Sequence, residues 1–159
     1  MIEQTLVLIK PDGVQRSLVG EIITRFERVG LKIVGMKLVW IDNKFAQKHY
    51  DAHKDKKFFK SLVGFLSEGP VVAVVLEGLH AIEVTRKLVG STEPKTAAPG
   101  TIRGDLAHHS YDYTDKKGIP IKNLIHASGD KNDAKKEIPL WFTQKEIHAY
   151  TSTHDVHVL

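Results

Sequence analysis

Pro70-Val-Val-Ala-Val-Val-Leu-Glu77 is the clearest strand of the chain, and it decides the fold. A short, continuous run of β-branched and aliphatic residues, preceded by Gly69, is typical of a buried strand. Its apolar part is far too short to span a lipid bilayer. We therefore expect this strand to lie in the core of a water-soluble domain.

The rest of the chain alternates between strand and helix patterns. Residues 5–9 are a compact β-rich run that ends in the turn Lys10-Pro-Asp-Gly13. Apolar residues then recur at helical spacing up to Val29, and Gly30 follows as a cap. Further strands are predicted over residues 31–41 and 124–127, and further helices over residues 43–50, 57–66, 80–89 and 130–138. In the strand at 31–41, four apolar residues are expected to share one face: Val34, Met36, Leu38 and Trp40.

This order of elements predicts an α+β fold. The predicted order is strand, helix, strand, helices, strand, helix, strand, helix. This order fits a ferredoxin-like (split βαβ) four-stranded antiparallel sheet, with its helices on one face. A doubly wound parallel sheet is the alternative, but no glycine fingerprint follows the first strand. We expect residues 1–159 to form a single domain, with an enlarged loop at about residues 106–122.

Composition narrows the class of protein further. The 159 residues contain no cysteine, so neither a disulfide framework nor a thiolate metal site can form. The formal net charge of +4 suits an anionic substrate and also leaves nucleic acid open. The lysine clusters at 54–60 and 131–136 are expected to be solvated helix faces. Because the N-terminus also lacks a signal-peptide pattern, we expect a cytoplasmic protein that binds no membrane.

The segment Asn123-Leu-Ile-His-Ala-Ser-Gly129-Asp130 places His126 at the end of the last predicted strand. Two interpretations are open. The neutral imidazole has a free lone pair and can accept a phosphoryl group. Alternatively, the ring lies in the core with both nitrogens hydrogen-bonded. The segment alone favours the second interpretation.

Three cationic side chains elsewhere change that balance. Lys10 follows the first strand, Arg86 lies on a predicted helix, and Arg103 lies in the turn Pro99-Gly-Thr-Ile-Arg-Gly-Asp105. Phosphoryl transfer spreads negative charge over oxygen atoms, and positioned cations are its main catalytic resource. Arginine adds a bidentate geometry that lysine lacks. One lysine and two arginines around a neutral histidine therefore fit the needs of phosphoryl transfer.

From about residue 5 to residue 142 the chain resembles the nucleoside diphosphate kinase family. Four strings occur in the family's order: Leu8-Ile-Lys-Pro-Asp-Gly-Val-Gln-Arg16, Gly69-Pro-Val-Val-Ala73, Pro99-Gly-Thr-Ile-Arg-Gly-Asp105 and Asn123-x-x-His-x-Ser128. The resemblance implies a ping-pong reaction. A nucleoside triphosphate gives its γ-phosphoryl group to the catalytic histidine, and a nucleoside diphosphate then collects it.

The resemblance also implies site residues. His126 is the phosphate-accepting nucleophile, Glu137 holds the other ring nitrogen, and Ser128 supports the histidine by hydrogen bonding. The phosphates are held at positions that match Lys10, Arg86, Thr92 and Arg103. Tyr50 matches a position near the transferred group. Lys10 and Asn123 match contacts to the ribose hydroxyls, and Phe58 and Leu62 match the base site. Stacking on an aromatic ring discriminates poorly between bases, so broad nucleotide specificity is expected.

Two further expectations concern bound partners. Mg²⁺ is expected on the nucleotide's phosphates, because no dense carboxylate cluster is present to hold it directly. Family members form tetramers or hexamers built on a common dimer, so the resemblance implies a homo-oligomer that binds ATP, GTP and other nucleotides.

The chain departs from the family pattern in two places. The family usually reads His-x-Ser-Asp, whereas this chain has Gly129 after Ser128 and its aspartate one position later, at Asp130. Asp130 is expected to cap the following helix and activity is expected to survive. The connection at residues 106–122 is longer than usual and is expected at the rim of the nucleotide site. The family has a small apolar residue that contacts the base just before the position of Asn123, and this chain has no clear counterpart of it. An exposed polar loop is favoured over a metal site at His108-His109, and likewise at His154 and His157.

Two competing functions remain. A catalytically silent relative could act as a binding or regulatory module, a possibility that Gly129 leaves open. A basic nucleic-acid-binding domain is supported only by the charge. The joint presence of the predicted cations, nucleophile and orienting carboxylate favours the enzyme.

Overall fold

The apolar run at residues 70–77 forms strand β3 (Val71–Leu79) in the interior of the sheet. The computed structural model describes residues 1–159 and contains one sheet in the order β2-β3-β1-β4. Every neighbouring pair is antiparallel, with β3 between β2 (Lys32–Val39) and β1 (Ile2–Ile9), and β4 (Ile125–Ala127) on the far side of β1. The predicted α+β, ferredoxin-like fold is confirmed.

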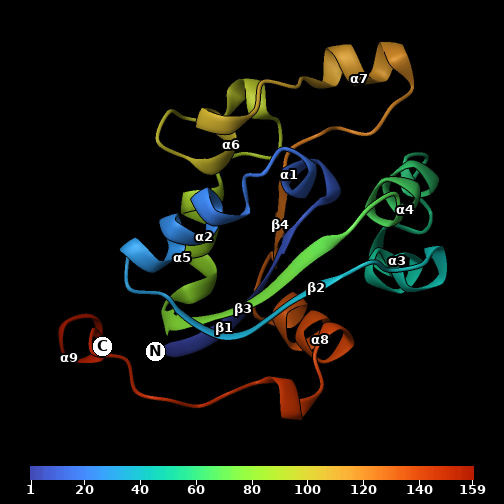
Figure 1. The fold of residues 1–159 in the computed structure, drawn as a ribbon. Helices are drawn as coiled ribbons and strands as arrows, with labels where there is room; N and C mark the ends of the chain where they lie inside the picture. Colours follow the sequence, from blue (N-terminus) through green and yellow to red (C-terminus); the bar gives the residue numbers. More distant parts are fainter.

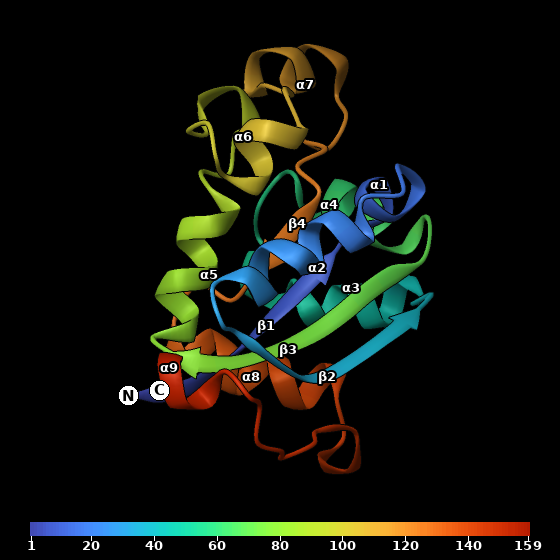
Figure 2. The ribbon, with the colours of Figure 1, turned by 60° about the vertical axis from the view of Figure 1, so that its left-hand side comes forward.

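Helices cover both faces of this sheet, so the expectation of helices on one face alone is wrong (Figures 1 and 2). Alternate residues of β1 point to opposite faces and are apolar on both. Val7 and Ile9 join one core cluster, and Leu6 and Leu8 join the other. The first cluster lies against α2 (Val19–Arg28) and α5 (Ala81–Val89), and the second against α3 (Asn43–His49), α4 (Phe59–Ser67) and α8 (Lys131–Trp141).

A β-bulge in β2 changes which side chains share a face. The pairing with β3 shifts between Ile33 and Gly35. An extra residue at a bulge reverses the alternation of side chains along the strand. Val34 is consequently buried in the α3/α4/α8 core, whereas Met36, Leu38 and Trp40 are exposed. The prediction that all four residues share one face is wrong for this reason.

Pro139 lies inside α8 and does not end it, contrary to the prediction. Proline removes one helical N–H donor and tends to kink or break a helix interior, so other contacts must hold this helix together. Here the last turn closes with a 2.8 Å bond from the Phe142 N–H to the Ile138 carbonyl. Trp141 and Phe142 are buried, and the Trp141 ring packs edge-on against Phe45. Burial of these aromatic rings therefore holds the final turn.

The remaining elements are short. Asp42, rather than the predicted Asn43, caps α3 by accepting a hydrogen bond from the Phe45 N–H. Residues 106–122 are not loop throughout, because Ser110 caps a helix there, and this helix lies beyond the end of the sheet (Figures 1 and 2). The short α-helices are α1 (Pro11–Gln15), α6 (Ile102–Leu106), α7 (Tyr111–Lys117) and α9 (Asp155–Val158), and 3-10 turns occur at Asp51–His53, Pro94–Thr96 and Gln144–Glu146. None of the helices combines the length and apolarity needed to cross a membrane.

Candidate active site

The neighbouring strands β1 and β4 place the predicted nucleophile and the first predicted cation together. His126 pairs with Leu8 across the two strands, and Lys10 follows directly after β1. The Lys10 N–H then donates a 2.8 Å hydrogen bond to the Leu124 carbonyl. Residues that are more than a hundred positions apart in the sequence therefore meet at one end of the sheet.

A cleft of about 670 Å³ opens at this end of the sheet. This volume lies within the range of small-molecule sites and is large enough for a nucleotide. The predicted site residues in its wall are Lys10, Tyr50, Phe58, Leu62, Arg86, Thr92, Arg103, Asn123 and His126. The two others, Ser128 and Glu137, lie behind His126. The fold thus brings the whole predicted set together, although the role of each residue stays a prediction.

The hydrogen bonds behind His126 decide which ring nitrogen can react. Glu137 Oε1 lies 2.9 Å from His126 Nε2, and the Ser128 hydroxyl donates to Glu137 Oε2 at 2.6 Å. A carboxylate only accepts, so Nε2 carries the proton and Nδ1 keeps its lone pair. Burial raises the pKa of Glu137, but the hydrogen bonds from His126 and Ser128 outweigh it and hold the pKa below its ordinary value. Ser128 therefore supports the histidine through Glu137.

His49 is an active-site neighbour that the sequence analysis missed. Its ring meets the His126 ring edge-on, with centroids 4.7 Å apart, and its Nδ1 accepts a 3.2 Å hydrogen bond from the Trp141 indole. Burial, followed by the effect of His126, lowers the pKa of His49 to about 3. A neutral ring therefore packs beside the nucleophile. No motif in the sequence distinguishes this histidine from the exposed ones.

Lys10 is buried within the cleft wall. Its ammonium group donates to the Asn123 side chain and lies 5.0 Å from the centre of the Phe65 ring. Burial lowers the pKa of Lys10 to about 8, Asp12 opposes that shift, and Arg103 adds to it. The charged form of this lysine is consequently costly until an anion enters the cleft.

Arg103 is also buried, and most of its donors are used within the protein. Its three guanidinium nitrogens each donate to a backbone carbonyl, those of Gly90, Asn123 and Ile125. Because a guanidinium has five N–H groups, two remain for a phosphate. Burial, and after it Arg86, lowers the pKa of Arg103 to about 10, so the group remains charged at neutral pH.

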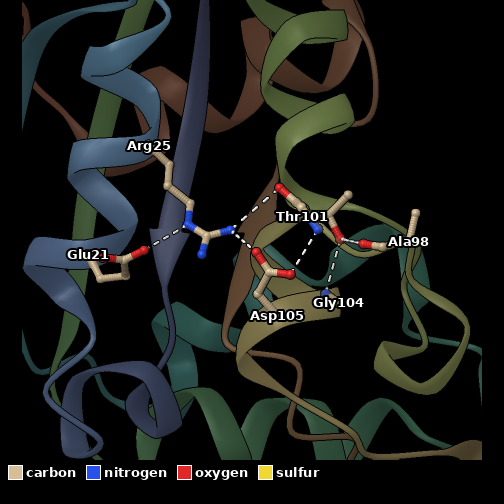
Figure 3. Close-up of polar contacts among 7 residues, drawn as sticks. Glu21, Arg25, Ala98, Thr101, Gly104 and Asp105 are labelled. Atoms are coloured by element: carbon tan, nitrogen blue, oxygen red, sulfur yellow. Dashed lines mark hydrogen bonds and ion pairs between the residues drawn. The ribbon is translucent and has the colours of Figure 1, made fainter.

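A polar network holds the turn that carries Arg103 (Figure 3). Arg25 on α2 donates to Glu21 at 3.0 Å and to Asp105 at 2.7 Å. The Gly100 N–H, and after it Arg25, lowers the pKa of Asp105. Gly104 is needed in this turn, because a Cβ atom there would collide with the Ala98 carbonyl. The family string at 99–105 is therefore a structural support for the arginine.

Asp12 is a second residue whose structural role the sequence did not reveal. It is buried, and its Oδ2 accepts a 3.0 Å hydrogen bond from the Leu124 N–H. Leu124 has a φ of 71°, a left-handed conformation that non-glycine residues rarely adopt. Asp12 thus holds the strained residue between Asn123 and β4.

The segment at residues 106–122 supplies a further part of the cleft wall. Its contributors include Tyr111, Asp115, Ile119, Pro120 and Ile121. The predicted position at the rim of the site is confirmed, and apolar side chains do stand just before Asn123, where the sequence showed no clear counterpart. On the other side of His126, Asp130 caps α8 as predicted by accepting from the N–H groups of Asn132 and Asp133.

A histidine with a free nitrogen, facing a cleft lined by buried cations, defines a phosphotransferase site. Comparison with known proteins gives the family. The model of nucleoside diphosphate kinases matches residues 3–147. The chain belongs to the nucleoside diphosphate kinase family, whose activity is phosphoryl transfer between nucleotides.

Relatives and solved structures agree with this assignment. A nucleoside diphosphate kinase of Pyrococcus furiosus is 53% identical, over 97% of this chain and 91% of its own length. The enzyme of Borrelia burgdorferi, solved as a transition-state mimic with bound vanadate and ADP, has a TM-score of 0.96 and 46% identity over 99% of this chain and 96% of that one. A halophilic enzyme of Halobacterium salinarum, in complex with CDP, has a TM-score of 0.87 and 42% identity over 98% and 97%.

Proposed function

We propose that this chain transfers the γ-phosphoryl group of a nucleoside triphosphate to a nucleoside diphosphate through a phosphohistidine at Nδ1 of His126. The observation that carries the proposal is the 2.9 Å contact between His126 Nε2 and Glu137, which leaves Nδ1 as the unprotonated nitrogen. Eight further side chains that the family resemblance implies line the same cleft as His126.

The reaction has two half-steps. The Nδ1 lone pair attacks the γ-phosphorus, and the bond from phosphorus to the bridging oxygen breaks, so that the nucleoside diphosphate leaves with that electron pair. The proton stays on Nε2, and the positive charge that develops on the ring is stabilised by Glu137. In the second half-step a terminal phosphate oxygen of another diphosphate attacks the phosphohistidine, and Nδ1 regains its lone pair.

The cationic side chains stabilise the charge that moves during both steps. Lys10 and Arg103 are buried beside the nucleophile, whereas Arg86 and Thr92 are exposed at the mouth of the cleft. Tyr50 is buried, and burial raises the pKa of its hydroxyl above its ordinary value, so it acts as a neutral donor to the transferred group. Fixed donors in a site that excludes water are the main source of catalysis in reactions of this kind.

In this proposal the base is held at an exposed part of the cleft wall and the ribose at a buried part. Phe58 is 52% exposed, which leaves its ring free to stack on a base, and Leu62 lies one turn further along α4. The hydrogen bond between Lys10 and Asn123 in the cleft wall supports the proposal that both hold the ribose hydroxyls. Stacking with few polar contacts accepts every base, so the specificity is broad.

Mg²⁺ enters this proposal with the nucleotide. The only histidine and carboxylate group with clustered ligand atoms is His49, His126 and Glu137, which is rich in nitrogen and unlike the all-oxygen surroundings that Mg²⁺ prefers. The cations of the cleft fit the phosphates instead. When bound, the ion neutralises phosphate charge and favours one phosphate geometry.

We infer that residues 1–159 act as one domain, in the cytoplasm, and as a homo-oligomer of four or six chains. The exposed Met36 and Leu38 on the edge strand β2, with the exposed Trp40 just after it, support an oligomer, because a free apolar edge favours contact with another chain. Cell fractionation tests the location, and sedimentation tests the assembly.

Labelling tests the chemistry. The wild-type chain, incubated with ATP labelled in its γ-phosphate, should acquire label that is labile in acid and stable in base. His126→Asn should lose it, and His108→Asn, a change at an exposed histidine, should keep it. Several nucleoside diphosphates should then discharge the label, with no strict requirement for one base. Absence of label on the wild-type chain, or its persistence in His126→Asn, would contradict the proposal.

A further inference from the structure

One face of α7 borders the nucleotide cleft. The residues Tyr111, Thr114 and Asp115 line it, at the i, i+3 and i+4 spacing that places side chains on the same side of a helix. The base-site residues Phe58, at the N-cap of α4, and Leu62, within α4, line the same cleft, and Figure 1 shows α4 and α7 as separate elements. A base held on α4 therefore has α7 as a second neighbour.

Several bonds fix α7 in place. The Tyr111 N–H donates a 2.9 Å hydrogen bond to the Glu93 side chain, and Ser110 caps the helix through the Tyr113 N–H. Just before the helix, the His109 carbonyl accepts from the Lys95 N–H at 3.1 Å. The helix is thus tied to the loop that follows α5, and its cleft face forms a fixed wall.

Asp115 is the only acidic side chain that this face presents to the cleft. No hydrogen bond or ion pair of the protein involves its carboxylate, whereas Asp112 on the same helix lies 3.4 Å from the Lys95 ammonium. A carboxylate has two acceptor oxygens and can accept two parallel hydrogen bonds. Asp115 is consequently free to pair with a ligand edge that carries two donors.

We propose that Asp115 determines base preference by accepting hydrogen bonds from guanine, so that GDP and GTP are favoured over other nucleotides. This inference rests on the proposed function of the cleft. The stacking on Phe58 accepts all bases, and Asp115 adds a graded preference on top of that breadth.

The chemistry of the bases explains the direction of the preference. Guanine presents its N1–H and its exocyclic amino group side by side, which matches a carboxylate. Adenine and cytosine present one amino donor beside a ring nitrogen that only accepts, and uracil presents one N–H between two carbonyls. An acceptor facing a carboxylate gains nothing and loses its contact with water. Guanine alone can use both oxygens of Asp115.

The test compares discharge of the phosphoenzyme by GDP, ADP, CDP and UDP. Wild-type kcat/KM should favour GDP over CDP by about fivefold to tenfold, the lower end for a bidentate pair in an open cleft. Asp115→Asn exchanges one acceptor for a donor and should reduce this ratio to nearly one. Asp112→Asn removes the same charge from the same helix and should leave the ratio unchanged. Because each ratio compares two substrates of equal charge, general repulsion of phosphate cancels.

The outcomes separate this inference from the function beneath it. If ATP forms no phosphohistidine, the proposed function fails and the inference fails with it. If the phosphohistidine forms but the wild-type ratio is close to one, only the role of Asp115 is lost. The same conclusion follows if Asp115→Asn and Asp112→Asn show the wild-type ratio alike.

Discussion

Glu137 controls the chemistry of His126 through a single bond, so its replacement isolates that control. Glu137→Gln keeps the size of the side chain but offers an amide that can donate to Nε2 and move the ring proton to Nδ1. We expect phosphohistidine formation to slow by roughly 100-fold, within the range for loss of a positioned proton-holding group. Rapid-quench labelling with ATP measures the rate. Glu83→Gln, at an exposed glutamate of α5, serves as the control, and an equal loss in both variants would count against the orienting role.

The lowered pKa of Lys10 predicts how nucleotide binding depends on pH. Its folded pKa of about 8 is below the ordinary value of 10.5, so at alkaline pH the folded protein holds fewer protons here than the unfolded chain. The cost of burying the charge is complete below about pH 8 and declines as the pH rises. A bound phosphate favours the charged form, so binding should take up a proton at about pH 8.5 and almost none at about pH 7. Calorimetry of ADP binding in two buffers of different ionisation enthalpy measures this uptake, and equal uptake at both pH values would exclude Lys10 as its source.

At the scale of residues, the sequence revealed the parts of the site that form continuous strings. Lys10, Arg103 and His126 each lie in a recognisable motif, and the fold brings them together as expected. His49 and Asp12 act through contacts with residues distant in the chain, the ring of His126 and the backbone of Leu124. A pattern of neighbouring residue types carries no information about such contacts.

The connection from Asn123 to β4 depends on Asp12. Asp12→Ala would leave the buried Leu124 N–H without an acceptor, at a cost of about 2 kcal/mol in the free energy of unfolding. Asp12→Asn keeps an acceptor oxygen and should lose much less. Denaturant unfolding compares the two variants. Similar losses for both would mean that the charge of Asp12, rather than its hydrogen bond, provides the stabilisation.

Pro139 is expected to make α8 less stable than the same helix with alanine at this position. It is exposed, and its ring removes a helical donor at a position that the sequence had suggested as the helix end. Pro139→Ala restores that hydrogen bond, which should raise the free energy of unfolding by up to about 3 kcal/mol. The unfolded chain becomes more flexible without proline, which lowers the free energy of unfolding by up to about 1 kcal/mol. We therefore expect Pro139→Ala to raise the free energy of unfolding by about 1 to 2 kcal/mol. Thermal and denaturant unfolding measure it, and an unchanged or lower stability would show that the helix is already distorted to fit proline.

At the scale of elements, local patterns predicted the strands and most helices but failed where tertiary contacts decide. The bulge at Val34 depends on the pairing of β2 with β3, and the helix through Pro139 depends on the burial of Trp141. Helices on both faces follow from residues 6–9, which are apolar without alternation. That pattern was visible in the sequence and, for a central strand, indicates burial on both sides.

At the scale of the whole molecule, the proposed oligomer makes a prediction about β2. Leu38 is 63% exposed on the edge strand, between Met36 at 56% and Trp40, just after the strand, at 70%. Leu38→Glu places a charge in the middle of this row, where burial against a second chain would leave it unpaired. We expect it to reduce the assembly mass in sedimentation. The melting temperature of the wild type should rise with protein concentration, because association stabilises the folded chain by mass action, and the variant should lose that dependence.

Val156→Glu, at a more exposed apolar residue on α9, is the matched control. If Leu38→Glu keeps the wild-type mass while Val156→Glu dissociates, the contact lies at the C-terminal helix and not at β2.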